Sequence, residues 1–237
     1  MPPCPAPTLL AAAGPLSQAA LLAALANYPP YYDESFDEIR ARIAAAGSAT
    51  KLDIGGLAAW KRLRCDTPWN RTLQHTPQVT VIAATQAAFL PGLTPVARVA
   101  ALRGNLAGMG ATFALGSALL TAWDMTNFAV TDRHARSAMR KLLSPLGCIC
   151  EVIRYPTYLD HVISLRDLVN VVKVGLPYTA RDVDKALYIL MGRSCPRLTG
   201  TRALICKLVS IPMPPRWKLH HRTSLGSARG CKRADEG

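Results

Sequence analysis

Apolar residues recur along most of the chain at the three- and four-residue intervals of an α-helix. Phe36, Ile39 and Ile43 share one side of a helix that meets a stop signal at Gly47. The same spacing, or a run of strong helix formers, predicts further helices around Ile54–Trp60 and over residues 16–26, 79–90, 95–103, 111–123, 133–142, 158–174 and 181–191. With one short extended piece expected over residues 151–155, the pattern predicts an all-α fold.

Cap signals mark the starts of several of these helices. Ser35–Glu38 has the form of a capping box, in which a hydroxyl and a carboxylate each accept a backbone N–H. Thr50–Asp53 and Thr179–Asp182 give similar signals, and Thr94–Pro95 places proline at the first helical position. The five prolines and one glycine within residues 1–15 predict an irregular beginning.

Charge divides the chain into a body and a tail. The net charge is +13 over 237 residues, and an acidic partner such as nucleic acid is the common explanation. Residues 195–237 hold nine Lys or Arg and two acids, which gives +7 and leaves +6 for the body. Within that segment, apolar periodicity does not extend beyond residues 203–211. We therefore expect a lead-in over 1–29, a helical domain over 30–193 and a basic, disordered tail over 194–237.

Cysteine usage argues against a disulfide framework or a zinc site. The seven cysteines are scattered and none forms a Cys-x-x-Cys pair. No metal or cofactor is therefore expected, and the thiols fit a reducing cytoplasm. The longest uncharged apolar run near the centre, 111–123, is too short to span a bilayer, so no membrane partner is expected.

The stretch from Gly104 to Leu142 joins two features with a chemical use. Leu106-Ala107-Gly108-Met109-Gly110 is a glycine-rich hairpin between helices, and backbone N–H groups in such a turn can hold a phosphate. Asp132 follows at the start of an Arg-rich helix, within the segment Val130-Thr131-Asp132-Arg133-His134-Ala135-Arg136. The stretch resembles the helix-hairpin-helix DNA glycosylase superfamily, including its 8-oxoguanine glycosylase-like branch. An inserted Thr131 departs from the family pattern.

The resemblance implies an all-α protein with a cleft that takes up a flipped, modified base of double-stranded DNA. Asp132 would be the catalytic carboxylate, and an ionised carboxylate suits a bond that breaks through a cationic sugar. The resemblance also suggests a set of DNA-binding residues in the hairpin, in the helix after Asp132 and in the segment 50–64. They are Gly108, Met109, Gly110, Ala111, Thr112, Arg133, His134, Arg136, Lys51 and Lys61.

Each of these residues also has a purely structural interpretation. Asp132 is a favoured N-cap, the glycines can form a tight turn between core helices, and the Arg residues can form a solvated face. Lys51 and Lys61 can likewise be surface charges beside a helix cap. Trp60, Trp123 and Phe128 fit a hydrophobic core better than a base-stacking platform.

Three functions are therefore open at this point. The first is a monomeric, cytoplasmic DNA glycosylase, which would be monofunctional because Thr112 stands where bifunctional members of the family carry an amine. The second is a helix-hairpin-helix DNA-binding protein without catalysis, and the third is a helical interaction module whose charge is incidental.

Overall fold

The computed structural model describes residues 14–63, 68–106, 109, 113–143, 154–171, 173 and 175–192. These residues form ten α-helices and one 3-10 turn and contain no β-strand, which confirms the all-α prediction. The helices are α2 Gly14–Ala26, η1 Pro30–Tyr32, α3 Glu34–Ala46, α4 Lys51–Trp60, α5 Pro68–His75, α6 Gln78–Phe89, α7 Pro95–Asn105, α8 Ala114–Trp123, α9 Arg133–Leu143, α10 Tyr155–Asn170 and α11 Ala180–Gly192.

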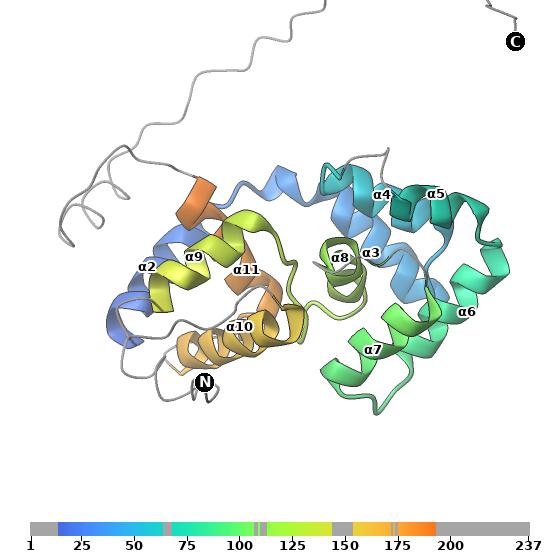
Figure 1. The fold of residues 1–237 in the computed structure, drawn as a ribbon. Coiled ribbons are helices and arrows are strands. Elements are labelled where there is room, and N and C mark those ends of the chain that lie inside the picture. Colours follow the sequence, from blue (N-terminus) through green and yellow to red (C-terminus); the bar gives the residue numbers. More distant parts are fainter. Residues whose placement is uncertain are drawn as a thin grey trace, which may run out of the picture.

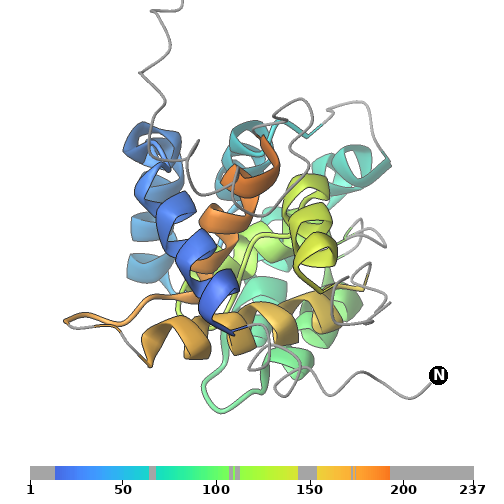
Figure 2. The same cartoon turned by 90° about the vertical axis from the view of Figure 1, so that its left-hand side faces the viewer.

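The helices lie in two groups with α8 between them (Figure 1). One group holds α2, α9, α10 and α11, and α11 packs against the other three. The other group holds α3 to α7, in which α3 packs on α4 and α6 packs on α7. Figure 2 shows α2 beside α11, so the N-terminal helix belongs to the packed body.

Helix α8 is the buried centre of the fold because most of its residues are apolar and its Ser117 and Thr121 hydroxyls bond to its own backbone. Leu119 and Leu120 have no exposed surface, and α8 contacts α3, α4 and α7. Gly116 lies so close to the Phe113 ring that a Cβ at this position would overlap it. The absence of a side chain at Gly116 therefore allows the buried Phe113 to pack against the start of the helix.

Three of the four predicted caps are present. The Thr50 hydroxyl accepts the Asp53 N–H at 3.2 Å, and the Asp53 carboxylate accepts the Thr50 N–H at 3.0 Å, which completes a capping box. Thr94 caps α7, with Pro95 following it. The Thr179 hydroxyl accepts the Asp182 N–H at 3.1 Å at the start of α11.

Three local predictions were wrong. Ser35 does not cap α3, because the helix already begins at Glu34 and the preceding Asp33 makes no side-chain cap. Tyr155, expected at the end of an extended piece, begins α10, which tolerates proline in its first turn. Helix α10 also ends at Asn170 rather than 174, where the Asn170 side chain exchanges two hydrogen bonds with the backbone of Tyr178. Residues 151–153 lie outside the described residues.

Candidate functional site

A pocket of about 530 Å³ lies where the two helix groups meet. The segment before α3, the end of α4, the start of α9 and one face of α11 contribute to it. The lining residues are Tyr28, Tyr32, Trp60, Lys61, Arg62, Leu63, Ala114, Val130, Thr131, Asp132, Arg133, His134, Arg136, Arg181, Asp184 and Tyr188. This volume lies within the range of small-molecule sites in proteins.

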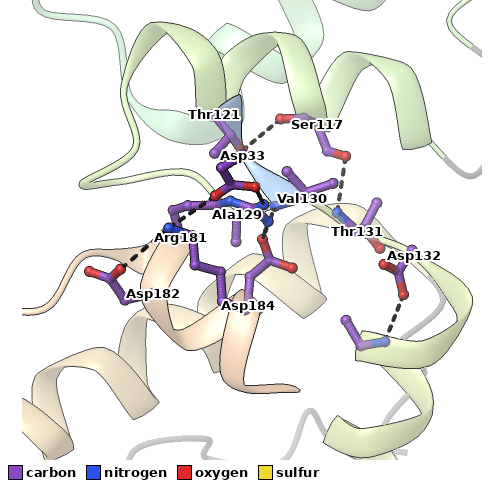
Figure 3. Close-up of polar contacts among 12 residues, drawn as sticks. Asp33, Ser117, Thr121, Ala129, Val130, Thr131, Asp132, Arg181, Asp182 and Asp184 are labelled. Carbon is purple, nitrogen blue, oxygen red and sulfur yellow. Dashed lines mark hydrogen bonds and ion pairs between the residues drawn. The ribbon is translucent and has the colours of Figure 1, made fainter. Parts of the chain in front are cut away.

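Asp132 caps α9 and also lines this pocket. Its Oδ1 accepts the Ala135 N–H at 2.7 Å (Figure 3), which is the N-cap hydrogen bond expected from the sequence. Arg136 Nε donates to the Asp132 main-chain carbonyl at 3.2 Å. Among the described residues, none donates a hydrogen bond to the other carboxylate oxygen, Oδ2. Asp132 is half-buried and lines the pocket. One of its carboxylate oxygens accepts the cap hydrogen bond, and the other can contact a ligand.

The segment before Asp132 is held by three hydrogen bonds from three different helices. These are Tyr155 Oη to the Ala129 carbonyl at 2.9 Å, Val130 N–H to Asp184 Oδ2 at 3.2 Å, and Thr131 N–H to Ser117 Oγ at 3.0 Å. The last two bring α11 and α8 together at the start of α9 (Figure 3). The Asp132 carboxylate is therefore held in place before any ligand arrives, as an electrostatic catalyst requires.

A buried network of charges lies against the pocket and fixes α11 to the start of α3. Arg181 donates to Asp33 Oδ1 at 2.8 Å and forms an ion pair with Asp184 (Figure 3). Lys185 lies 3.0 Å from the other oxygen of Asp33, and Tyr28 Oη donates to Asp33 Oδ1 at 2.8 Å. Arg181 and both carboxylates are almost completely buried. The network therefore joins segments that are 148 residues apart in the chain.

The two carboxylates of this network differ in acidity. Burial opposes the ionisation of Asp33, but the charges of Arg181 and Lys185 outweigh it and hold its pKa below the usual value. Burial raises the pKa of Asp184 to about 6, against the opposing charge of Arg181 and with a further contribution from Asp132. Asp184 is therefore the weaker acid, and it lies on the pocket side of the network.

Lys61 is a partly buried amine in the same pocket. Burial lowers its pKa to about 8, and the carboxylates of Asp132 and Asp184 act in the opposite direction. Among the described residues, none accepts a hydrogen bond from its amine or forms an ion pair with it within 4.0 Å. Lys61 thus lines the pocket with an amine whose donors the described residues leave unused.

The end of α4 fixes the position of this lysine. Leu63 N–H donates to the Ala58 carbonyl at 2.9 Å and Arg62 N–H donates to the Ala59 carbonyl at 3.0 Å, the pattern of a Schellman motif. Arg62 takes the left-handed conformation with φ of 53°, at a position where glycine is usual. A strained residue thus follows Lys61 directly at the pocket wall.

Aromatic rings form part of the pocket wall. Trp60 Nε1 donates to the Tyr32 carbonyl at 2.9 Å, and Tyr188 meets the His134 ring edge-on at 5.9 Å. Phe128 and Trp123 were expected in the core: Phe128 is buried, and Trp123 stacks on Phe89 and packs against the core. Trp60 does both, since it packs against the core and lines the pocket.

The structure brings together only part of the set proposed from the sequence. Asp132, Arg133, His134, Arg136 and Lys61 all line the pocket.

The other members of that set lie elsewhere. Lys51 is not in the pocket, and its Nζ donates to the Gln74 carbonyl at 2.8 Å. Met109 packs against the hydrophobic core. Gly108, Gly110, Ala111 and Thr112 lie outside the described residues, as does the tail, so the predictions about them stay predictions.

Sequence reasoning missed the residues that α11 contributes. Arg181 and Asp184 are opposite charges three positions apart on the face that also carries the buried Ala180, Val183 and Leu187. Charges on an otherwise apolar face rarely occur unless they are paired, so this pattern was the available signal. The pairing with Asp33 had no local signal, because the partner lies at the other end of the domain.

No helix within the described ranges is long and apolar enough to cross a membrane. A search of the same residues finds no group of three or more His, Cys, Asp or Glu side chains arranged to hold a metal ion. Comparison of the chain with protein-family models, with curated proteins and with solved structures found no match, so the function has to be argued from the pocket itself.

Proposed function

We propose that the protein binds double-stranded DNA and hydrolyses the N-glycosidic bond of a modified base that has been flipped out of the helix. Asp132 is the catalytic carboxylate of this reaction. The observation that carries the proposal is its position: a half-buried carboxylate with one oxygen in a cap and the other available within a pocket of about 530 Å³.

The chemistry of the pocket suits this reaction. Breaking the bond between the sugar C1′ and the base leaves positive charge on the sugar, and a fixed carboxylate stabilises that charge. The same carboxylate can orient the water that attacks C1′. Trp60, Tyr32 and Tyr188 line the pocket, and aromatic side chains of this kind can stack on a base.

The basic residues around the pocket suit the nucleic acid backbone. Arg62 and Arg133 are exposed at the pocket, and Arg140 and Lys141 are exposed further along α9. Such side chains contact phosphate without regard to sequence and position the duplex. A duplex lying across the start of α9 would bring a flipped nucleotide to Asp132.

Single-turnover excision assays test this function directly. A panel of duplexes, each with one modified base, is incubated with excess protein, and the abasic product is revealed by alkaline cleavage. Release of at least one base is the expected result. If no duplex loses a base while the protein still binds DNA, the non-catalytic DNA-binding function is the one that remains.

That second function is favoured by one specific observation. Asp132 already serves as the cap of α9 through Ala135, so its presence has a structural explanation that needs no chemistry. An asparagine at this position separates the two roles, because it caps about as well as aspartate and carries no charge.

A further inference from the structure

We infer that Lys61 is the general acid of the proposed reaction and gives its ammonium proton to the departing base while Asp132 faces the sugar. This inference rests on the proposed function and assigns a second catalytic residue to the same pocket. It is drawn from the position of Lys61 in the pocket and from the lack of a partner for its amine among the described residues.

Geometry is the first argument. Lys61 and Asp132 come from different helix groups, the end of α4 and the start of α9, and line one pocket. The Schellman turn that ends α4 fixes the backbone of Lys61. A nucleotide in this pocket would therefore meet a carboxylate from one side and an amine from another.

The unused donors of the Lys61 amine are the second argument. Arg181 and Lys185 both contact Asp33, whereas the Lys61 amine forms no hydrogen bond or ion pair with any described residue. A partly buried ammonium without an acceptor is unfavourable, and a ligand atom that accepts its proton removes that cost. Oxygen and nitrogen atoms at the edge of a nucleobase are acceptors of this type.

The acidity of the amine agrees with this role. With its pKa lowered to about 8, Lys61 is largely protonated at pH 7 and is a stronger acid than an ordinary lysine. A general acid works best when its pKa lies near the working pH. An ordinary lysine would hold its proton too tightly to release it to a base.

The atoms and charges of the step balance. The bond between C1′ and the base nitrogen breaks, its electron pair stays with the base, and the base takes a proton from the Lys61 ammonium. The sugar cation, stabilised by Asp132, is attacked at C1′ by water, whose proton is taken up by the carboxylate. Solvent then returns Lys61 and Asp132 to their starting states, and the net change is hydrolysis.

Several other charged groups face Lys61 and influence its titration. Asp132 and Arg136 approach from the α9 side, and Asp184 and Arg181 approach from α11. The remaining titratable groups of the pocket are Tyr28, Tyr32, Arg62, Arg133, His134 and Tyr188. A His134→Gln variant is a further control for the pH profile, because His134 lines the same pocket.

The test compares the pH dependence of single-turnover excision in the wild type, Lys61→Met and Lys61→Arg. The wild-type rate should fall above pH 8 by about tenfold per pH unit, because the neutral amine has no proton to give. Both variants should bind DNA and excise about 10²–10⁴-fold more slowly. Their rates should not show this fall. Arginine keeps the charge but does not release its proton, so it should not rescue the rate.

Lys173→Met is the matched control, because this lysine lies over the Tyr178 ring and does not line the pocket. It should keep the wild-type pH profile. Excision by Lys61→Met within tenfold of the wild-type rate would overturn the inference. A covalent Lys61–DNA adduct trapped by borohydride would also overturn it, because the amine would then act as a nucleophile.

A measurement that needs no excision separates this inference from the proposed function. The rate of acetylation of each lysine in the full-length protein is followed against pH by mass spectrometry. Lys61 should become reactive with a midpoint near pH 8, well below the ordinary lysine value. A midpoint at the ordinary lysine value overturns the inference alone, whereas a wild type that releases no base refutes the proposed function.

Discussion

Replacing Arg181 with methionine should destabilise the protein more than any change to its surface charges. The side chain is 4 % exposed and lies between two buried carboxylates, Asp33 at 6 % and Asp184 at 1 %. Removing one partner of a buried ion pair typically costs about 3–5 kcal/mol, because the other charge stays buried and uncompensated. Lys185 still pairs with Asp33, so the buried charge left without a partner is mainly that of Asp184.

The pH dependence of this loss follows from the pKa of Asp184. Its folded-state pKa, about 6, already lies above the usual value for aspartate, and removal of the Arg181 charge raises it further. The folded variant then binds a proton more tightly than the unfolded chain does, so its stability rises as the pH falls. The loss of stability of Arg181→Met relative to the wild type should be larger at pH 7 than at pH 5.

Urea unfolding followed by circular dichroism at both pH values measures the effect. Arg40→Met is the control, because Arg40 pairs with Asp37 on the surface, with side chains 43 % and 59 % exposed. It should cost no more than about 1 kcal/mol. Adding Asp184→Asn to Arg181→Met should recover much of the loss, since asparagine still accepts the Val130 N–H without a charge. If Arg181→Met lowers the free energy of unfolding no more than Arg40→Met does, the buried network does not stabilise the fold.

Three further substitutions test local features by their melting temperatures. Arg62→Gly should stabilise the fold by about 1 kcal/mol, because it relieves the left-handed residue at the pocket wall, and unchanged stability would argue against strain there. Thr131→Val should be neutral or stabilising by up to about 1 kcal/mol, since the buried Thr131 hydroxyl has no hydrogen-bond partner within the described ranges. A clear loss of stability would show that this hydroxyl does have a partner. Gly116→Ala should cost about 1–3 kcal/mol, because its Cβ would displace the Phe113 ring, and wild-type stability would show that the ring moves freely.

The helices were predictable because their signals are local. The apolar spacing of Phe36, Ile39 and Ile43 and the capping box at Thr50 depend on residues only a few positions apart. The predicted cap at Ser35 was wrong because α3 already begins at Glu34. The residue before it, Asp33, does not cap the helix either, because its carboxylate binds Arg181 of α11, a contact between distant parts of the chain.

The candidate site was predictable in part for the same reason. Asp132 and the basic residues after it are contiguous, and their cap geometry is as expected. The other wall of the pocket comes from Lys61 and from α11, whose approach to Asp132 depends on tertiary packing. Periodicity places Asp184 on the buried face of α11, but it does not show that its carboxylate accepts the Val130 N–H beside Asp132.

The single-turnover excision rate of Asp132→Asn, on whichever duplex the wild type cleaves, tests the central claim most directly. Asparagine keeps the hydrogen bond to Ala135 and removes the negative charge from the pocket. The free energy of unfolding of the variant should therefore lie within about 0.5 kcal/mol of the wild-type value. The variant should bind the duplex equally well and lose most of its excision activity. An asparagine variant that folds, binds and releases the base at the wild-type rate would contradict a catalytic role for Asp132.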